Sequence, residues 1–297
     1  KADVSPIYKK LDNLMKENYR PVSVLSCLSK LFEQILAKQL GEFFDVIFDK
    51  MICAYRKKYS CENTLIYLTE QWKNALGKNM AVGALLMDLS MAFDCLPHSL
   101  LIAKLNAYNV SEDACLLLSS YLSNRNQRVK VANVKCDWEL IKKGIPQGSG
   151  LGPLIFNIFM CDIFYEVKYC QLINYADDNT LTVYDEDVSI VTKSLKHDAN
   201  KAISWFKNNY MKANPDKFQV LFLKPPWSKN YKIPNNFSLE TINIEVTTEV
   251  KLLGVVIDDK LSFETQVSKV CKKAGKQINA LKRLSIDLNK SEKMLIF

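Results

Sequence analysis

Apolar residues in the first 80 positions recur at helical spacing in two stretches. The first follows the candidate N-cap residues Ser23 and Ser26 and consists of Leu28, Leu31, Phe32, Ile35, Leu36 and Leu40. The second runs from about Cys61 and places Leu65, Leu68, Trp72 and Leu76 on one face. We expect both to be core helices. Residues 1–20 carry several cations with little periodicity, which predicts an extended basic lead-in or a solvated tail.

Other stretches have the patterns of strands. The apolar run Val82–Met87 is typical of a buried central strand, and Asp88 ends it. Residues 172–184 predict two short strands joined by a polar turn. Further strands are expected at 218–223, around 242–246 and at 250–257.

Helical periodicity returns in the second half of the chain. Helices are expected after Pro97, near 112–122, from Leu154 to about Phe164, and from Val188 to near Tyr210. A last helix has one apolar face, made by Val267, Val270, Ala274, Ile278 and Leu281, and one basic face, made by Lys269, Lys272, Lys273 and Lys276. A basic amphipathic helix of this kind is compatible with a nucleic-acid backbone and equally with a solvated surface.

Composition limits the possible classes of protein. Of the 297 residues 48% are hydrophobic, enough for a packed core divided among two or three subdomains. No apolar run reaches the roughly 18 residues of a membrane span, and the start at Lys1 without a signal peptide predicts a piece of a longer protein. Nine cysteines without a Cys-x-x-Cys pair, and only two histidines, argue against zinc and against a secreted disulfide framework. The net charge of +8 favours a polyanionic partner, and the expected setting is a reducing, intracellular one.

Three aspartates suggest a cation site. Asp177 and Asp178 lie side by side in the predicted turn of the hairpin. Adjacent unpaired carboxylates favour their neutral forms unless a cation is close. Asp88, at the end of an apolar strand, also needs a partner. The chain supplies its own control at Asp258-Asp259, a second pair that we interpret as ordinary turn chemistry.

Two further segments have ligand-binding character. The run Tyr55-Arg56-Lys57-Lys58-Tyr59 interleaves aromatic rings with cations ahead of a helix, a pattern that suits phosphates and bases or a solvated charge run. The glycine- and proline-rich loop 144–153 allows the backbone to approach a ligand closely, or is simply a tight turn.

Seven short motifs occur in one order along the chain: Asn18-Tyr19-Arg20-Pro21-Val22-Ser23, Tyr55-Arg56-Lys57, Met87-Asp88-Leu89-Ser90-Met91-Ala92-Phe93-Asp94, Ile145-Pro146-Gln147-Gly148-Ser149, Tyr175-Ala176-Asp177-Asp178, Asn214-Pro215-Asp216-Lys217 and Leu252-Leu253-Gly254. In this order they resemble the reverse transcriptases of non-LTR, LINE-type retrotransposons of the jockey-like kind. The resemblance covers essentially the whole chain.

The resemblance implies an α+β protein with the right-hand polymerase fold, which has fingers, a palm of antiparallel strands and a thumb. It implies the N-terminal part of the fingers in residues 1–80, the first metal-binding strand of the palm in 81–97, a helical segment of fingers and palm in 98–143, the rest of the palm in 144–262, and the beginning of a thumb in 263–297.

The implied activity is that of an RNA-directed DNA polymerase, which extends a primer 3′-hydroxyl with dNTPs by two-metal-ion phosphoryl transfer. Asp88, Asp177, Asp178 and a backbone carbonyl near Leu89 would hold two Mg²⁺ ions, with Mn²⁺ as a possible substitute. The implied partners are an RNA template, a DNA primer or target DNA, and dNTPs, without a membrane. The chain would belong to a longer polyprotein or ribonucleoprotein in the cytoplasm and nucleus.

The resemblance implies roles for other residues. Arg56, with Lys57 or Arg20, would meet the triphosphate, and Phe93 would contact the incoming sugar. Gln147 and Gly148 would form the floor under nucleotide and template. The primer grip would be Leu252, Leu253 and Gly254, and further nucleic-acid contacts would come from Lys269, Lys272, Lys273 and Lys276. Lys217 is the candidate general acid for pyrophosphate, or else a solvated turn lysine. Phe93 has the alternative of an ordinary core aromatic.

Two other classes compete with an active enzyme. A catalytically degraded or domesticated nucleic-acid-binding protein would fit the departures from the family pattern at Leu11, Met91 and Gly150. The retained aspartates, with Gln147 and Lys217, favour activity. An RNA-dependent RNA polymerase would be expected to have Gly in place of Ala176.

Overall fold

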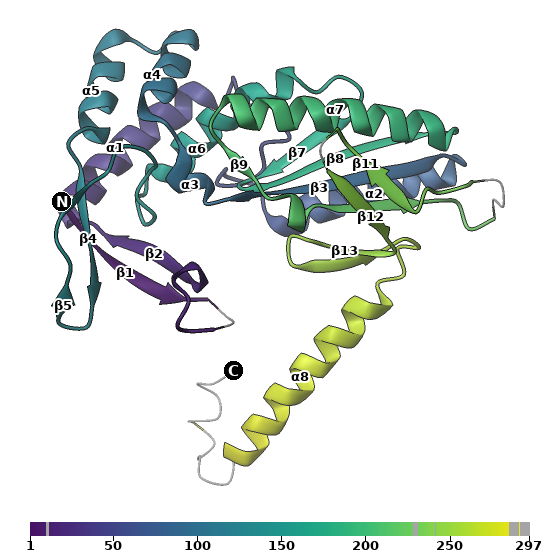
Figure 1. Cartoon of the computed structure of the whole chain (residues 1–297). Helices are drawn as coiled ribbons and strands as arrows, with labels where there is room; N and C mark the ends of the chain where they lie inside the picture. Colours follow the sequence, from purple (N-terminus) through teal and green to yellow (C-terminus); the bar gives the residue numbers. More distant parts are fainter. Residues whose placement is uncertain (10–11, 228–230, 241, 285–290, 292–297) are drawn as a thin grey trace.

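The larger part of the molecule is organised on a seven-stranded sheet (Figure 1). The structure is a computed structural model that describes residues 1–9, 12–227, 231–240, 242–284 and 291. The strand order is β11-β12-β10-β3-β8-β7, and β9 pairs with the end of β3. The strands are β3 (Ala81–Ser90), β7 (Gln171–Tyr175), β8 (Asp178–Asp185), β9 (Lys212–Ala213), β10 (Gln219–Leu223), β11 (Asn236–Ser238) and β12 (Asn243–Thr247).

Helices cover both faces of this sheet, which explains why β3 is apolar at successive positions rather than at every second one. Val82, Ala84 and Leu86 face α2 (Cys61–Gly77), whereas the intervening residues face α7 (Val188–Asn208). Gly83 allows α7 to approach closely, since a Cβ there would lie 2.6 Å from a methyl group of Val191. The predicted central strand, the hairpin and both helices are therefore confirmed.

A smaller sheet forms the other end of the molecule. Its order is β2-β1-β4-β5, with β6 on β4, and it lies beside α1, α4 and α5 (Figure 1). The elements are β1 (Ala2–Tyr8), β2 (Tyr19–Val24), α1 (Cys27–Phe44), α4 (His98–Ala107), α5 (Glu112–Leu122), β4 (Asn126–Val131), β5 (Val134–Lys135) and β6 (Glu139–Leu140). The extended conformation expected in residues 1–20 is confirmed in β1 and at the start of β2. The alternative of a solvated tail was wrong, because β1 pairs with both β2 and β4 and buries Ala2 and Val4.

Helix α1 begins as predicted but buries a different face. The Ser26 hydroxyl caps the helix by accepting from the backbone N–H of Ser29 at 3.2 Å. The buried side chains are Glu33, Leu36, Leu40 and Phe44. The predicted core positions Leu28, Leu31 and Ile35 are more than half exposed. The sequence offers two apolar stripes on this helix, and spacing alone does not say which one the fold covers.

The connecting helices include short elements that the sequence did not predict. Short helix α3 (Ala92–Cys95) follows β3, and α6 begins at Gly152 rather than Leu154. After Met160, where α6 ends, the chain continues as the 3-10 helix Cys161–Tyr165. A second 3-10 helix, Pro215–Lys217, leads into β10.

The predicted strand 250–257 is a hairpin. Strands β13 (Glu249–Leu252) and β14 (Val255–Asp258) turn at Leu253 and Gly254, which have φ angles of 47° and 89°. Positive φ at both central residues is the conformation of a tight type I′ turn. Leu-Gly lacks the asparagine or aspartate that usually marks such a turn, so the break was missed.

Helix α8 (Glu264–Leu284) projects away from the two sheets (Figure 1). Its predicted apolar face is largely uncovered, with Val267, Val270 and Ile278 each about half exposed. Leu11 and residues 285–290 and 292–297 of the expected thumb lie outside the described residues. In the part of the chain that the structure describes, no helix is long and apolar enough to cross a lipid bilayer.

Candidate active site

Antiparallel pairing brings the three predicted aspartates together. Asp88 on β3 lies directly opposite Asp178, the first residue of β8. Asp177 precedes Asp178 in the turn that joins β7 to β8. Opposed residues on neighbouring antiparallel strands have Cβ atoms about 4.5–5.5 Å apart. The register of the sheet, rather than a flexible loop, therefore places these carboxylates.

Two buried asparagines hold the turn between β7 and β8. Ala176 has a φ of 56°, a left-handed conformation that is uncommon for residues other than glycine. The Asn174 side-chain amide donates to the Ala176 carbonyl at 2.8 Å and to Asn179 Oδ1 at 2.9 Å, and Asn179 donates to the Asp177 carbonyl at 3.1 Å. Neither asparagine was predicted from the sequence. The available signal was an amide at each of two strand positions where an apolar residue would be expected.

The electrostatics of the three carboxylates are unfavourable without a cation. Burial, reinforced by the charges of Asp177 and Asp88, raises the pKa of Asp178 to about 6. Burial and the Asp88 charge also raise the pKa of Asp177, against the opposing effects of Arg20 and Lys217. Both aspartates still reach solvent at the surface of the sheet. The surrounding protein and their mutual repulsion leave an excess of negative charge at this point.

Lys217 partly compensates that charge. Its ammonium group lies 2.9 Å from Asp88 Oδ2, although 62% of its side chain is exposed. The 3-10 helix Pro215–Lys217 is held beside β3 by the hydrogen bond from the Asn214 N–H to the Asp88 carbonyl. The structure therefore brings Lys217 to the aspartates and pairs it with Asp88.

The donor set fits a divalent cation in its chemistry. Carboxylate oxygens are the hard ligands that Mg²⁺ prefers, and burial together with the neighbouring carboxylates raises the pKa of both Asp177 and Asp178. Within the described residues, however, no group of three His, Cys, Asp or Glu side chains is already arranged as a metal site. Asp88 is engaged by Lys217 instead. The Leu89 side chain is apolar and buried, and its backbone pairs with Ala213. The backbone carbonyl is therefore the only group of Leu89 that could bind a cation.

A cavity of about 310 Å³ adjoins Asp88 and Asp178. Leu252, Leu253 and Lys217 also line this cavity. The predicted primer-grip residues are thus brought to the aspartates, with Gly254 completing the same turn. This proximity comes from the β13–β14 hairpin, which the sequence did not predict.

The loop 144–150 is fixed against two other segments. The Gln147 carbonyl accepts from the Ser23 N–H at 2.7 Å, and its side-chain amide donates to both oxygens of Asp94 at 3.1 and 3.2 Å. Gly148 has a φ of 113°, and a Cβ there would lie 2.7 Å from the Ser23 carbonyl. Only glycine fits at this position. The close approach expected of this loop is therefore made to β2.

Phe93 is half-buried at the edge of the core. Its ring stacks on the fully buried Phe156 with centroids 4.6 Å apart and meets Tyr55 edge-on at 6.3 Å. Both the core interpretation and the sugar-contact interpretation are compatible with this position.

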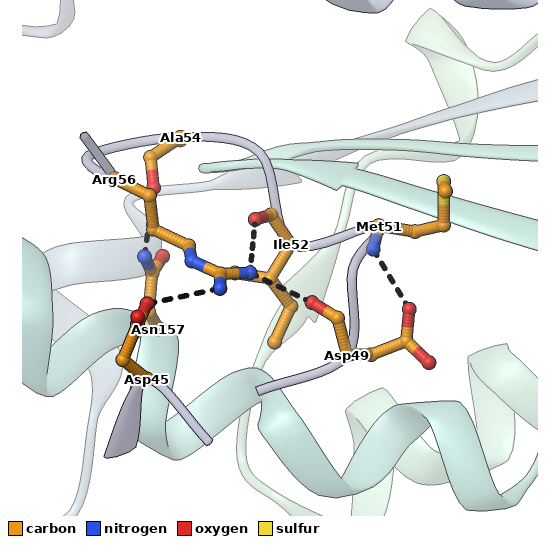
Figure 2. Close-up of polar contacts among 7 residues, drawn as sticks. All are labelled: Asp45, Asp49, Met51, Ile52, Ala54, Arg56 and Asn157. Carbon is orange, nitrogen blue, oxygen red and sulfur yellow. Dashed lines mark hydrogen bonds and ion pairs between the residues drawn. The ribbon is translucent and has the colours of Figure 1, made fainter. Parts of the chain in front are cut away.

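Arg56 is turned into its own loop (Figure 2). Its guanidinium donates to the carbonyls of Asp49 and Ile52 at 2.9 and 3.2 Å and to Asp45 Oδ1 at 3.1 Å. It also lies over the ring of Tyr59 at 4.7 Å. In the same view Asn157, from α6, donates to the Ala54 carbonyl. In this structure Arg56 therefore organises the loop, and its predicted contact with a triphosphate would need these bonds to be exchanged.

The remaining predicted cations divide into two groups. Arg20 is exposed and close enough to stabilise the charge of Asp177, while Lys57 is exposed. Lys269, Lys272, Lys273 and Lys276 are exposed on the projecting helix α8. None of these four lines the cavity beside Asp88.

Comparison with known proteins identifies the family. The family model described as "Reverse transcriptase (RNA-dependent DNA polymerase)" matches residues 7–257. The chain belongs to the reverse transcriptase family. The family in general uses divalent metal ions.

Named relatives agree with the predicted kind of reverse transcriptase. "Probable RNA-directed DNA polymerase from transposon BS" of Drosophila melanogaster is 26% identical over 94% of this chain and 31% of its own length. "RNA-directed DNA polymerase from mobile element jockey" of the same fly is 26% identical over 86% of this chain and 28% of its own length. The predicted jockey-like resemblance is confirmed. The chain spans about a third of the length of these curated relatives.

Solved structures agree on the fold. Telomerase from Candida tropicalis in complex with a TWJ fragment of telomeric RNA has a TM-score of 0.52 and 13% identity, over 82% of this chain and 43% of that chain. Apo telomerase of the same species, truncated from the C-terminal domain, has a TM-score of 0.51 and 13% identity, over 81% of this chain and 52% of that chain. The predicted α+β polymerase fold of this reverse transcriptase is confirmed.

Proposed function

We propose that this reverse transcriptase segment is the polymerase part of a non-LTR retrotransposon RNA-directed DNA polymerase, which extends a primer 3′-hydroxyl with dNTPs. The observation that carries the proposal is the register that sets Asp88 opposite Asp178 and beside Asp177. Asp88 and Asp178 line a cavity that Leu252 and Leu253 also line. A primer end held by the β13–β14 hairpin would therefore face the aspartates.

Asp88, Asp177 and Asp178 would hold two divalent cations, Mg²⁺ or Mn²⁺, with the Leu89 carbonyl as a further ligand. The chemistry supplied by such a bound pair is activation of the 3′-hydroxyl and neutralisation of pyrophosphate charge. The β3–β8 register keeps the carboxylates in place, and the bonds from Asn174 and Asn179 keep the turn in its left-handed conformation.

Lys217 would act on the leaving group. The Lys217 ammonium group lies 2.9 Å from the Asp88 carboxylate and lines the cavity, so it would be free to turn toward that cavity if Asp88 held a cation instead. There it can donate a proton to pyrophosphate. Gln147 and Gly148 would form the floor under the nucleotide and Phe93 would contact the sugar, while Arg20, Lys57 and a rearranged Arg56 would meet the triphosphate.

The seven-stranded sheet would be the palm, the five-stranded sheet with its helices the fingers, and α8 the start of a thumb that carries Lys269, Lys272, Lys273 and Lys276 along nucleic acid. Helix α2, in residues 1–80, packs on the larger sheet and would belong with the palm. The partners would be an RNA template, a DNA primer or target DNA and dNTPs. The whole protein would be a longer polyprotein or ribonucleoprotein of the cytoplasm and nucleus.

Primer extension on an RNA template with Mg²⁺ tests this proposal. The wild-type chain should extend, and Asp88→Asn should abolish extension while template–primer binding remains. Binding should weaken steeply with salt, because lysine and arginine contacts to phosphates release counterions. A wild-type chain that binds template–primer but does not extend it under any of these conditions would instead support a degraded or domesticated binding protein.

A further inference from the structure

One carboxylate of the fold is completely buried outside the cluster of aspartates. Glu33 on α1 is 0% exposed. Its Oε1 accepts from the Tyr121 hydroxyl at 2.5 Å, and its Oε2 accepts from the Ser149 hydroxyl at 2.9 Å and the Gly150 N–H at 2.7 Å. A buried carboxylate is strongly unfavourable unless it is fully hydrogen-bonded. These three donors come from α5 and from the loop directly after Gln147 and Gly148.

The Glu33 contact continues into α6. The Ser149 hydroxyl that donates to Glu33 also accepts from the N–H groups of Leu151 and Gly152 at 3.2 and 3.0 Å. It therefore satisfies the otherwise unpaired donors at the start of α6, and Glu33 lies near the favourable positive end of that helix. Glu33 thus contacts the loop at the point where the loop passes into α6.

The same loop is held from its other side by β2. Ser23 donates its N–H to the Gln147 carbonyl at 2.7 Å, and its own carbonyl leaves no room for a Cβ on Gly148. Gln147 and Gly148 are consequently fixed between Ser23 and the Glu33 cluster. Burial, together with the hydrogen bond to Glu33, raises the pKa of Tyr121 to about 12, so Tyr121 remains a donor at all working pH values.

We propose that Glu33 is a positioning residue that fixes the backbone of Gln147 and Gly148 as the nucleotide-binding floor. The nucleotide part of this inference rests on the proposed function. Packing alone does not account for Glu33, since replacing buried ionic groups by apolar ones of similar size is often neutral or stabilising. A carboxylate with three donors from two segments instead specifies one arrangement of the loop.

Glu33→Gln is the test, because the glutamine amide keeps the size but presents donors where one carboxylate oxygen accepts. Glu42→Gln, at an exposed position of the same helix, is the matched control. Hydrogen exchange of amides 147–152 is measured without substrate. It should accelerate roughly tenfold or more in Glu33→Gln, the effect of losing one charge-assisted hydrogen bond, and stay unchanged in Glu42→Gln.

Single-nucleotide extension supplies the second readout. Glu33→Gln should raise the KM for dNTP roughly tenfold while template–primer binding and kcat at saturating dNTP change by less than about threefold. A lower melting temperature with unchanged loop exchange and unchanged KM would overturn the proposal and leave Glu33 a stabilising core residue. If the wild-type chain does not extend a primer, the proposed function fails, whereas the exchange experiment still decides whether Glu33 fixes the loop.

Two gentler variants decide the question if Glu33→Gln does not fold. Tyr121→Phe and Ser149→Ala each remove one donor and leave the carboxylate in place. Both should accelerate exchange of the same amides and raise the dNTP KM in the same direction, Ser149→Ala more because it also removes the acceptor for Leu151 and Gly152. Unchanged exchange in both variants would contradict the proposal.

Discussion

The chain contains two Asp-Asp pairs at the ends of strands, and their surroundings differ completely. Asp177-Asp178 lies at the β7–β8 turn, where burial and the neighbouring charges of Asp177 and Asp88 raise the pKa of Asp178 to about 6. Asp258 lies at the end of β14 and accepts backbone hydrogen bonds from Lys260, Ser262 and Phe263. Burial alone would raise its pKa, but these bonds outweigh it, and the pKa of Asp258 lies below its ordinary value.

The comparison indicates that an Asp-Asp pair is a candidate for binding a cation when the protein supplies too few donors to its carboxylates. The dipeptide alone is not sufficient. Asp258 obtains its donors from the next five residues and needs nothing from outside. Asp178 lies opposite Asp88 in the sheet, and the asparagines that hold its turn donate to backbone carbonyls and to each other rather than to the carboxylates. The proposed cation site and a stable turn thus contain the same dipeptide.

The largest expected effect comes from removing one carboxylate of the first pair. Asp178→Asn should reduce primer extension by more than about a thousandfold, the effect of losing several kcal/mol of transition-state charge stabilisation. Template–primer binding should remain, and in metal-free buffer above pH 6 the variant should be at least as stable as wild type, because the charge repelled by Asp88 and Asp177 is gone. Single-turnover extension and urea unfolding measure the two effects. Retained extension would remove Asp178 from the metal site.

The second-largest effect is expected on sugar selectivity when Phe93 is replaced. It shows whether the sugar of the incoming nucleotide lies against Phe93. If the ring contacts the sugar, Phe93→Val should raise incorporation of rNTP relative to dNTP roughly tenfold to a hundredfold, because a steric overlap is relieved. Phe156→Val, which alters the ring stacked beneath Phe93, is the control and should lower stability without changing the ratio. An unchanged rNTP-to-dNTP ratio in Phe93→Val, with a lower melting temperature, would mean that Phe93 is a core aromatic and does not contact the sugar.

Arg56 is a cation whose charge is already balanced within the protein, by Asp45 and two backbone carbonyls. Arg56→Met should cost about 1–3 kcal/mol of unfolding free energy, because the change removes charged donors and leaves the part-buried Ile52 carbonyl and the exposed Asp49 carbonyl without them. The exposed neighbour Lys57 should tolerate the same change to Met within about 0.5 kcal/mol. Denaturant unfolding compares the two variants. Equal stability of both would mean that the guanidinium contacts contribute nothing to the fold and that Arg56 is free for a phosphate.

The smallest effect is expected at the second Asp pair. Asp258→Asn should lower stability by about 1 kcal/mol, as for loss of a capping carboxylate, and should leave extension within about twofold of wild type. Asp259→Asn is the matched control and should change stability less. Thermal unfolding and primer extension check both variants.

The pH dependence of stability should have opposite signs at the two pairs. The pKa of Asp258 is lower in the folded than in the unfolded state, so its contribution is present above its ordinary pKa of 3.8 and is lost as pH falls below that value. The pKa of Asp178 is higher in the folded state, so the folded chain binds more protons between 3.8 and about 6 and loses stability as pH rises through that range. Difference curves of each Asn variant against wild type, in metal-free buffer, should therefore slope in opposite directions. Parallel curves would contradict the assignment.

Features coded by short stretches were predictable from sequence, whereas features set by tertiary packing were not. The hairpin around Asp177 and the buried strand ending near Asp88 follow from local patterns, and their pairing follows the family resemblance. The burial of one stripe of α1 depends on what packs against it. The inward turn of Arg56 depends likewise on carbonyls of its own loop that only the folded chain presents.

The central claim, that the aspartates around Asp178 form a cation site and those around Asp258 form a turn, is tested most directly by metal-dependent stability. The melting temperature of wild type, Asp178→Asn and Asp258→Asn is measured while Mg²⁺ or Mn²⁺ is increased at constant ionic strength. A bound ion stabilises the folded state by mass action, so wild type and Asp258→Asn should show the same rise and Asp178→Asn should show none. An equal rise in all three proteins, or no rise in wild type, would contradict the account.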